Sequence, residues 1–159
     1  MTIEVRRSAR DAAEAAKDRD FIQDLGSRSV MSSVASLRPA SEANARTAFA
    51  RLCEVVESQS NVTLVADLDG ERAGFLLLLD RLPDEVTLLD QAFVAYMAVE
   101  PGLRGRGVGA ALLDAAEDEA RRRRLPYIAL MVTEENDAAQ RLYARSGYRT
   151  ERRLLCKPL

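Results

Sequence analysis

The most informative stretch of this sequence is Val99-Glu-Pro-Gly-Leu-Arg-Gly-Arg-Gly-Val-Gly109. It joins an apolar run to a helical pattern and carries alternating glycines and arginines. Glycine lets the backbone bend and approach a ligand closely, and the first amides of a helix point outward without partners. The helix dipole also favours negative charge at this end. The segment Arg104 to Gly109 therefore predicts an anion-binding turn, to which two arginine side chains add positive charge.

After this loop the sequence alternates between helical and strand patterns. Gly107 to Arg124 has apolar residues at helical spacing, and Pro126 follows as a stop signal. Tyr127 to Val132 is typical of a strand. Asn136 to Gly147 predicts a second helix with a glycine at its C-terminal cap, and Tyr148 to Lys157 predicts the last strand or strands.

Before the loop, the sequence predicts a run of antiparallel strands. Leu88 to Val99 is an apolar run rich in aromatic and branched residues, which indicates a buried central strand. Asn61 to Asp67 and Ala73 to Asp80 are also strand-like. Asp69-Gly70 between them is a strong signal for a hairpin turn. The unit from Leu88 to Val132 should place two parallel strands side by side.

The N-terminal part predicts one short strand and two helices. Ile3 to Val5 is strand-like, and Ser8-Ala-Arg-Asp11 has the form of a capping box that begins a helix. That helix should run to about Leu25 and be interrupted by the stretch Gly26 to Pro39. Apolar residues at helical spacing then indicate a second helix over Ala45 to Val56.

The resulting order is β-α-α-β-β-β-α-β-α-β, which is mixed and not strictly alternating. This order favours an α+β fold with a mostly antiparallel sheet and helices on both faces over a doubly wound parallel sheet. A length of 159 residues is enough for one domain with its own core, and no internal repeat or linker divides it. We therefore expect a single domain over residues 1–159.

Composition limits the chemistry and the partners of the chain. Hydrophobic residues make up 47%, charged residues 30%, and the net charge of −2 gives no basic field that would attract nucleic acid. No apolar run approaches the about 18 residues of a membrane-spanning helix, and the first residues do not resemble a secretory signal, so a cytoplasmic location is expected. Histidine is absent, which excludes histidine triads and the usual zinc sites. Carboxylates, tyrosine, backbone amides and water remain for catalysis, and no metal site is expected.

Three interpretations of the glycine-rich loop compete on sequence alone. The first is an ordinary glycine-rich turn with solvated arginines. A nucleotide P-loop is excluded, because no Lys-Ser or Lys-Thr follows the last glycine. A dinucleotide-binding loop fits Gly105-x-Gly107-x-x-Ala110, with Glu134 at the end of the next strand. Its position argues against it, because the first glycine follows the predicted strand only after several residues and little chain remains to complete such a sheet.

Two motifs in this sequence resemble those of the GNAT acetyltransferase superfamily. Arg104-Gly-Arg-Gly107-Val-Gly109 resembles the signature Arg/Gln-x-x-Gly-x-Gly/Ala that begins the coenzyme helix of the family. Asn136-Asp-Ala-Ala-Gln-Arg-Leu-Tyr143-Ala-Arg-Ser-Gly-Tyr148 resembles the pattern Asn-x-x-Ala-x-x-Leu-Tyr-x-x-x-Gly-Phe. The close resemblance covers about Tyr96 to Tyr148, and the order of elements extends it to the whole chain. It implies the acyl-CoA N-acyltransferase fold, with six or seven strands and about four helices.

The resemblance also implies a function and a set of coenzyme-binding residues. GNAT enzymes move the acetyl group of acetyl-CoA to a primary amine of a small molecule, an amino acid or a protein, by direct attack in a ternary complex. By similarity, the backbone amide of Met97 stabilises the oxyanion and Tyr143 gives its proton to the departing thiolate. The residues expected to bind the coenzyme are Met97, Ala98, Val99, Arg104, Gly105, Arg106, Gly107, Val108, Gly109, Asn136 and Tyr143.

The acceptor side is less defined by the sequence. In this fold the acceptor enters beside the first two helices, so Asp24, Arg28, Ser29, Ser32 and Ser33 are candidate lining residues, with Glu134 on the opposite side. The candidates for the general base are Glu134, Glu135, Asp90 and a water relay. Relatives that acetylate protein N-termini often carry glutamate where this chain has Met131, which argues against that substrate class.

Two alternatives to an acetyltransferase remain open at this point. One is a coenzyme A sensor on the same fold that transfers nothing. The other is a dinucleotide-binding protein built on the glycine-rich loop. The resemblance also leaves a homodimer open, because relatives pair or exchange their C-terminal strand.

Overall fold

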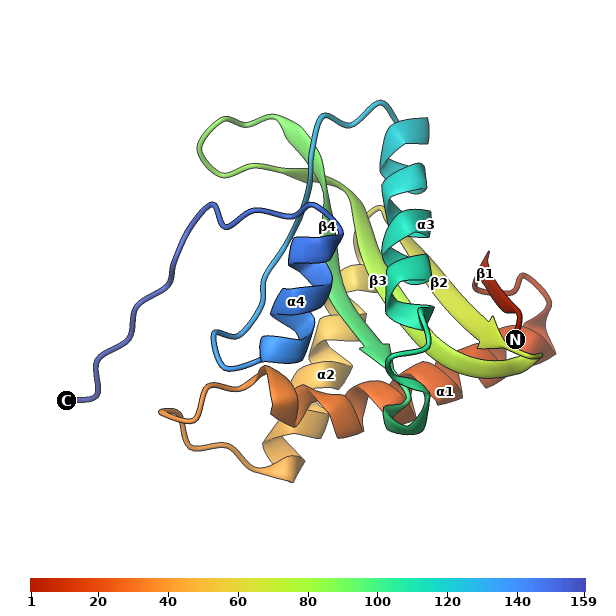
Figure 1. Cartoon of the computed structure of the whole chain (residues 1–159), viewed down its shortest axis with the longest axis horizontal. Coiled ribbons are helices and arrows are strands. Elements are labelled where there is room, and N and C mark those ends of the chain that lie inside the picture. The colour runs from red at the N-terminus through yellow and green to blue at the C-terminus, as the bar shows by residue number, and fades with distance from the viewer.

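The computed structural model describes residues 1–159 as one layered α+β structure (Figure 1). The elements are β1 (Ile3–Arg7), α1 (Ala12–Ser29), η1 (Val30–Ser33), α2 (Glu42–Glu57), β2 (Asn61–Leu68), β3 (Glu71–Pro83), β4 (Asp90–Val99), η2 (Pro101–Leu103), α3 (Val108–Arg122), β5 (Ile128–Leu130) and α4 (Asp137–Arg145). The sheet has five strands in the order β1-β2-β3-β4-β5, of which only β4 and β5 are parallel. The predicted α+β class is confirmed, and the parallel pair after the central strand is confirmed with it. No helix is both long and apolar enough to span a membrane.

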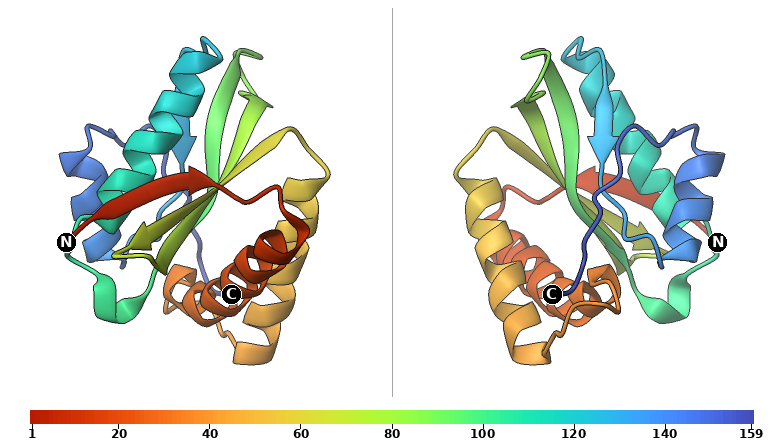
Figure 2. Two further views of the ribbon diagram at one scale, coloured as in Figure 1. Left: turned by 90° about the vertical axis from the view of Figure 1, so that its right-hand side faces the viewer. Right: turned by 90° about the vertical axis from the view of Figure 1, so that its left-hand side faces the viewer.

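The sheet separates two apolar cores, one under each pair of helices (Figure 2). On one face, Leu112 and Leu113 of α3 are fully buried against β2, β3 and β4. On the other face, Leu25 of α1 and Phe49 of α2 are fully buried against Phe75 of β3. Each strand can serve both cores because successive side chains alternate between its faces.

The hairpin between β2 and β3 forms where the sequence predicts it. Asp69 and Gly70 have φ angles of 53° and 88°, the left-handed values that a two-residue turn between twisted strands requires. Gly147 after α4 has a φ of 87°, as expected for a glycine that ends a helix. Local turn chemistry therefore identified both positions.

The first helix begins and ends differently from the prediction. Its N-cap is Asp11, whose carboxylate accepts from the amides of Ala13 and Glu14, and not Ser8. The helix also continues through Gly26 to Ser29, although the glycine was expected to interrupt it. A Cβ on Gly26 would lie 2.0 Å from Cζ of Phe49. The glycine is therefore a contact point between α1 and α2, and helix packing outweighs its low helix propensity.

The sheet has five strands and not six or seven, because no strand forms after α4. Residues 149–159 form no regular structure and leave the body of the protein as an extended segment (Figure 1). Leu154 and Leu155 are 92% and 87% exposed, so no surface of this chain covers them. The segment contacts the β3–β4 connection through Arg152, whose guanidinium pairs with Asp84 at 3.0 Å. The strand predicted over Tyr127 to Val132 is likewise reduced to Ile128–Leu130.

We predict that Gly26→Ala destabilises the protein, although alanine is the better helix former. The added Cβ overlaps the Phe49 ring, and such overpacking costs about 1–3 kcal/mol. Urea denaturation followed by circular dichroism measures the change in the free energy of unfolding. Gly102→Ala is the control, because no atom lies within 4 Å of its added Cβ. Equal or greater stability of the Gly26→Ala variant would contradict this account of the contact.

Candidate functional site

The loop between β4 and α3 presents a row of backbone amides. Gly105 and Gly107 have φ angles of 76° and 90°, which other residues adopt only with strain. Gly107 is the N-cap of α3 and no side chain caps this helix. The first hydrogen bond of the helix runs from the amide of Ala111 to the carbonyl of Gly107 at 3.0 Å. The preceding amides of the first turn therefore face outward at the positive end of the helix dipole.

The third glycine of the loop has a packing role. A Cβ on Gly109 would lie 3.0 Å from Cδ2 of Leu142 in α4 and 4.0 Å from Cε of Met97 in β4. Glycine at this position lets the start of α3 approach both elements closely. The amide-bearing turn, the end of β4 and α4 are thereby held together.

The C-terminal half of β4 has an unpaired backbone edge, which we call the free side of β4. Pairing with β5 covers only Ala92, Phe93 and Val94, so β5 does not reach residues 95–99. Glu100 donates its amide to the carbonyl of Ala73 in the adjoining strand. The next residue back, Val99, is therefore in a non-hydrogen-bonded pair with Gly74, and its own N–H and C=O point away from β3.

The backbone groups of successive residues in β4 point in alternate directions, which decides which of the expected coenzyme-binding residues face the free side of the strand. The N–H and C=O of Met97 point to the free side like those of Val99. Those of Ala98 point toward β3, and its side chain is buried in the core under α1 and α2. The structure therefore brings Met97 and Val99 to the site and leaves Ala98 without an accessible polar group. Arg104 reaches the same place, because its Nε donates to the carbonyl of Val99 at 3.3 Å.

Helix α4 places Asn136 and Tyr143 next to this edge. Asn136 caps the helix, with its side-chain oxygen accepting from the amide of Ala139 at 3.2 Å. Tyr143 is half-buried in the core that also contains Met97, and its ring packs against Tyr148. Burial raises the pKa of Tyr143, and the nearby phenol of Tyr96 raises it further. The Tyr143 hydroxyl therefore stays protonated at neutral pH.

Several of the residues expected near the acceptor or as its general base are held in ion pairs. The guanidinium of Arg28 pairs with Asp24 at 2.8 Å and with Glu100 at 2.9 Å, so it links α1 to the loop after β4. Ser29 is the last residue of α1 and stands beside this group. Asp90 lies at the opposite end of β4 from Met97 and faces Arg81 at 3.8 Å, which removes it from the site.

A connection between η1 and the segment before α4 is not predicted by the sequence. The hydroxyl of Thr133 donates to the carbonyl of Ser33 at 2.6 Å. The amide and hydroxyl of Ser36 both donate to the carboxylate of Glu135, the latter at 2.9 Å. These bonds join residues about a hundred positions apart in the chain, and short polar residues in two loops give no periodic signal that could have predicted them.

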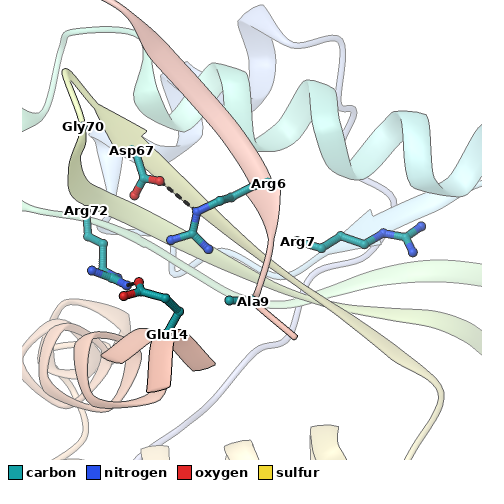
Figure 3. A pocket seen from close by; sticks show the side chains of 7 residues that line it. All are labelled: Arg6, Arg7, Ala9, Glu14, Asp67, Gly70 and Arg72. Atoms are coloured by element: carbon teal, nitrogen blue, oxygen red, sulfur yellow. Dashed lines mark hydrogen bonds and ion pairs between the residues drawn. The ribbon is translucent and has the colours of Figure 1, made fainter. Parts of the chain in front are cut away.

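A polar cavity lies elsewhere in the molecule. It has a volume of about 280 Å³ and is lined by residues of β1, the start of α1 and the β2–β3 hairpin (Figure 3). Arg6 pairs with Asp67 and Arg72 with Glu14, each at 2.9 Å, and both arginines also bind the fully buried Asp18. Burial opposes ionisation of Asp18, but its hydrogen bonds outweigh this and hold its pKa well below the ordinary value. The arginines and carboxylates that line it form a structural ion cluster, in which Oδ1 of Asp67 is buried without a hydrogen-bond partner.

The comparison with protein families identifies the chain. The sequence profile of the acetyltransferase (GNAT) family matches residues 31–148, which include the glycine-rich turn, β4 and α4. The chain belongs to the acetyltransferase (GNAT) family. GNAT enzymes use acetyl-CoA, so the anion-binding turn found here has a ligand in this family.

Curated relatives match this GNAT chain over part of their length. It is 36% identical over 80 residues to a mycothiol acetyltransferase of Beutenbergia cavernae, which covers 50% of this chain and 26% of that protein. It is 42% identical over 55 residues to an acetyltransferase of Pectobacterium atrosepticum, which covers 35% of this chain and 39% of that one. The chain therefore spans well under half of either relative.

Solved structures share the GNAT fold over nearly the whole chain. A protein of Pyrococcus furiosus described as an acetyl transferase has a TM-score of 0.80 at 24% identity, covering 99% of this chain and 100% of its own. The aminoglycoside N-acetyltransferase AAC(6')-Iy, solved in complex with CoA, has a TM-score of 0.67 at 17% identity and 98% coverage of both chains. At these identities the likeness establishes the fold.

Proposed function

We propose that this chain transfers the acetyl group of acetyl-CoA to a primary amine by direct attack in a ternary complex. One arrangement carries this proposal: the uncapped N-terminus of α3, the free side of β4 and the phenol of Tyr143 lie together. An anion-binding turn, an unpaired strand edge and a proton donor are the three parts that binding and cleaving a coenzyme thioester require.

The coenzyme would bind along these three parts in order. Its pyrophosphate would accept hydrogen bonds from the backbone amides of residues 104–109, with the helix dipole and the exposed Arg106 adding positive charge. The amide-rich pantetheine arm would pair with Met97 and Val99 as an added strand does, because their backbone groups point to the free side of β4. Asn136 stands where its side chain could also reach that arm.

The reaction needs a group that accepts a proton from the amine, a hydrogen-bond donor that stabilises the oxyanion, and a group that donates a proton to the thiolate. The neutral amine attacks the thioester carbonyl, and the N–H of Met97 stabilises the oxygen that becomes negative. The carbon–sulfur bond then breaks, and the thiolate takes the proton of Tyr143. Because Ser36 occupies the carboxylate of Glu135 and Asp90 is remote, Glu134 or a water molecule takes the proton that the amine loses.

The acceptor is a primary amine that approaches from the side of α1 and α2. The group formed by Asp24, Arg28 and Glu100 borders this approach, and Ser29 lies next to it. The names of proteins with the same fold suggest acceptors for a first screen, which are an aminoglycoside and glucosamine 6-phosphate.

Calorimetric titration with acetyl-CoA tests the proposed coenzyme site. We expect binding by the wild type and its loss in Gly107→Glu, because a carboxylate would stand where the pyrophosphate binds and a side chain would strain a φ of 90°. Gly102→Glu is the matched control, since it adds the same charge to the same loop in open space. Circular dichroism checks that the variants fold. Failure of the wild type to bind acetyl-CoA would refute the proposal, and binding of NADP instead would favour the dinucleotide alternative. Binding without acetylation of any screened amine would favour a coenzyme A sensor.

Replacing Tyr143 tests the assignment of the proton donor. We expect Tyr143→Phe to lower kcat by about 100-fold or more while the affinity for acetyl-CoA stays unchanged, because only proton donation to the thiolate is lost. Since burial and Tyr96 raise the pKa of Tyr143, the wild type should keep its activity to alkaline pH and lose it only as this phenol ionises. Tyr127→Phe, which changes an exposed tyrosine, is the control. An unchanged kcat in Tyr143→Phe would remove this residue from the mechanism.

The exposed C-terminal segment supports a homodimer. Leu154 and Leu155 are uncovered, and β5 is an edge strand with a neighbour on one side only. The segment of one copy could pair with β5 of another and cover both. We expect light scattering to give the mass of a dimer for the wild type and of a monomer for Leu154→Asp/Leu155→Asp, with Thr150→Asp as the control. A monomeric wild type would contradict this proposal.

A further inference from the structure

Tyr96 faces the helices α1 and α2 because β4 contains a bulge. Leu77 pairs with Tyr96 but the next residue of β3, Leu78, pairs with Val94, which leaves Ala95 as an extra residue. Regular alternation would put Tyr96 on the same face as Val94, in the core under α3. The extra residue places both Ala95 and Tyr96 in the core under α1 and α2.

The ring of Tyr96 is fixed by two buried aromatic side chains. Its centroid lies 5.3 Å from that of Phe49 in an edge-on contact and 6.1 Å from that of Phe75 in a stacked one. Both phenylalanines are fully buried. A ring packed on two sides in this way holds its hydroxyl in one direction.

The hydroxyl of Tyr96 interacts with groups of three elements around the free side of β4. Ser33 of η1 and Arg104 of the loop before α3 act on its pKa, and Tyr96 in turn raises the pKa of Tyr143 in α4. Ser33 is itself held by Thr133. Burial raises the pKa of Tyr96, which Ser33 and Arg104 partly offset, so this phenol is uncharged at neutral pH. The two phenols therefore approach one region from opposite sides of the sheet.

We propose that Tyr96 is an acceptor-binding residue of the acetyl-transfer site, with its hydroxyl oxygen accepting a hydrogen bond from the incoming amine. This inference rests on the proposed acetyl transfer and adds the residue that orients the acceptor. On the α4 side, Tyr143 donates a proton to the thiolate sulfur. On the side of α1 and α2, Tyr96 accepts a hydrogen bond from the amine nitrogen. An N–H directed at a neutral oxygen leaves the nitrogen lone pair free to face the thioester carbonyl.

The same position favours an uncharged amine as the species that binds. The positive charge of Arg104 acts on the Tyr96 hydroxyl and disfavours a second positive charge there. Asp24 and Glu100, the acidic groups that border the proposed acceptor approach, are already paired with Arg28. Tyr96 therefore selects the nucleophilic form of the acceptor, with no carboxylate needed in contact with the nitrogen.

Steady-state kinetics of Tyr96→Phe test the contact with the acceptor. The variant keeps the ring between Phe49 and Phe75 and loses only the hydroxyl. With the amine of the screen that the wild type acetylates fastest, we expect KM for the amine to rise about three- to tenfold, the value of one neutral hydrogen bond. KM and the calorimetric affinity for acetyl-CoA should not change. Tyr127→Phe is the matched control, since it removes the hydroxyl of an exposed tyrosine. An unchanged KM for the amine in Tyr96→Phe would overturn the proposal.

Absorbance of ionised tyrosine tests the placement of the two phenols without any substrate. The chain has four tyrosines and no tryptophan, so each Tyr→Phe change removes a distinct part of the signal. Because Tyr96 raises the pKa of Tyr143, Tyr96→Phe should move the titration of Tyr143 to lower pH, whereas Tyr127→Phe should not. Circular dichroism at each pH defines the range in which the protein is folded. A buried titration that stays in place would show that the phenols do not share one region.

The two proposals fail in distinguishable ways. A wild type that binds no acetyl-CoA refutes the acetyl transfer itself. If the wild type acetylates an amine and Tyr96→Phe has the same KM for that amine, only the role of Tyr96 is refuted.

Discussion

The early end of the pairing between β4 and β5 is the constraint on which the rest of the site depends. Only residues 92–94 of β4 pair with β5, so the second half of this partly buried strand keeps an edge without a neighbouring strand. Buried backbone groups normally find partners, and an unpaired edge inside a sheet is costly unless something fills it. The proposed pantetheine arm satisfies this requirement, with Met97 and Val99 supplying the hydrogen bonds.

The bulge at Ala95 decides which face of the sheet each of the following side chains of β4 enters. It lies just beyond the last pair with β5, and it changes which face each following side chain enters. Met97 and Val99 consequently face the side of α3 and α4, whereas Tyr96 faces α1 and α2. In the proposed reaction the coenzyme and the acceptor therefore reach the same strand from opposite sides, which allows direct transfer in a ternary complex.

Two groups of ion pairs hold the surrounding elements in place. The cluster around the buried Asp18 ties β1 and α1 to β2 and β3. At the far end of α3, Glu119 binds Arg7 of β1 and Arg123. Removing one partner of a buried pair leaves an uncompensated charge, so loss of either Asp18 or Glu119 would leave its arginine partners without their buried carboxylate. Ile3 of the same strand lies beside Gly107, which connects this frame to the anion-binding turn.

The sequence by itself determined the features that local chemistry encodes. Glycines 105 and 107 predicted the uncapped turn, Asn136 and Gly147 predicted the ends of α4, and Asp69-Gly70 predicted the hairpin, because each depends on the backbone angles or caps of a few neighbouring residues. The two motifs likewise identified the family and most of the residues now placed around the free side of β4.

Only the tertiary structure decided the features that depend on distant partners. Gly26 continues a helix because Phe49 packs on it, and the segment after α4 forms no strand and leaves Leu154 and Leu155 exposed. The role proposed for Tyr96 was hidden for a related reason. Strand alternation assigns it to one face, and a single extra residue, visible only in the register with β3, moves it to the other.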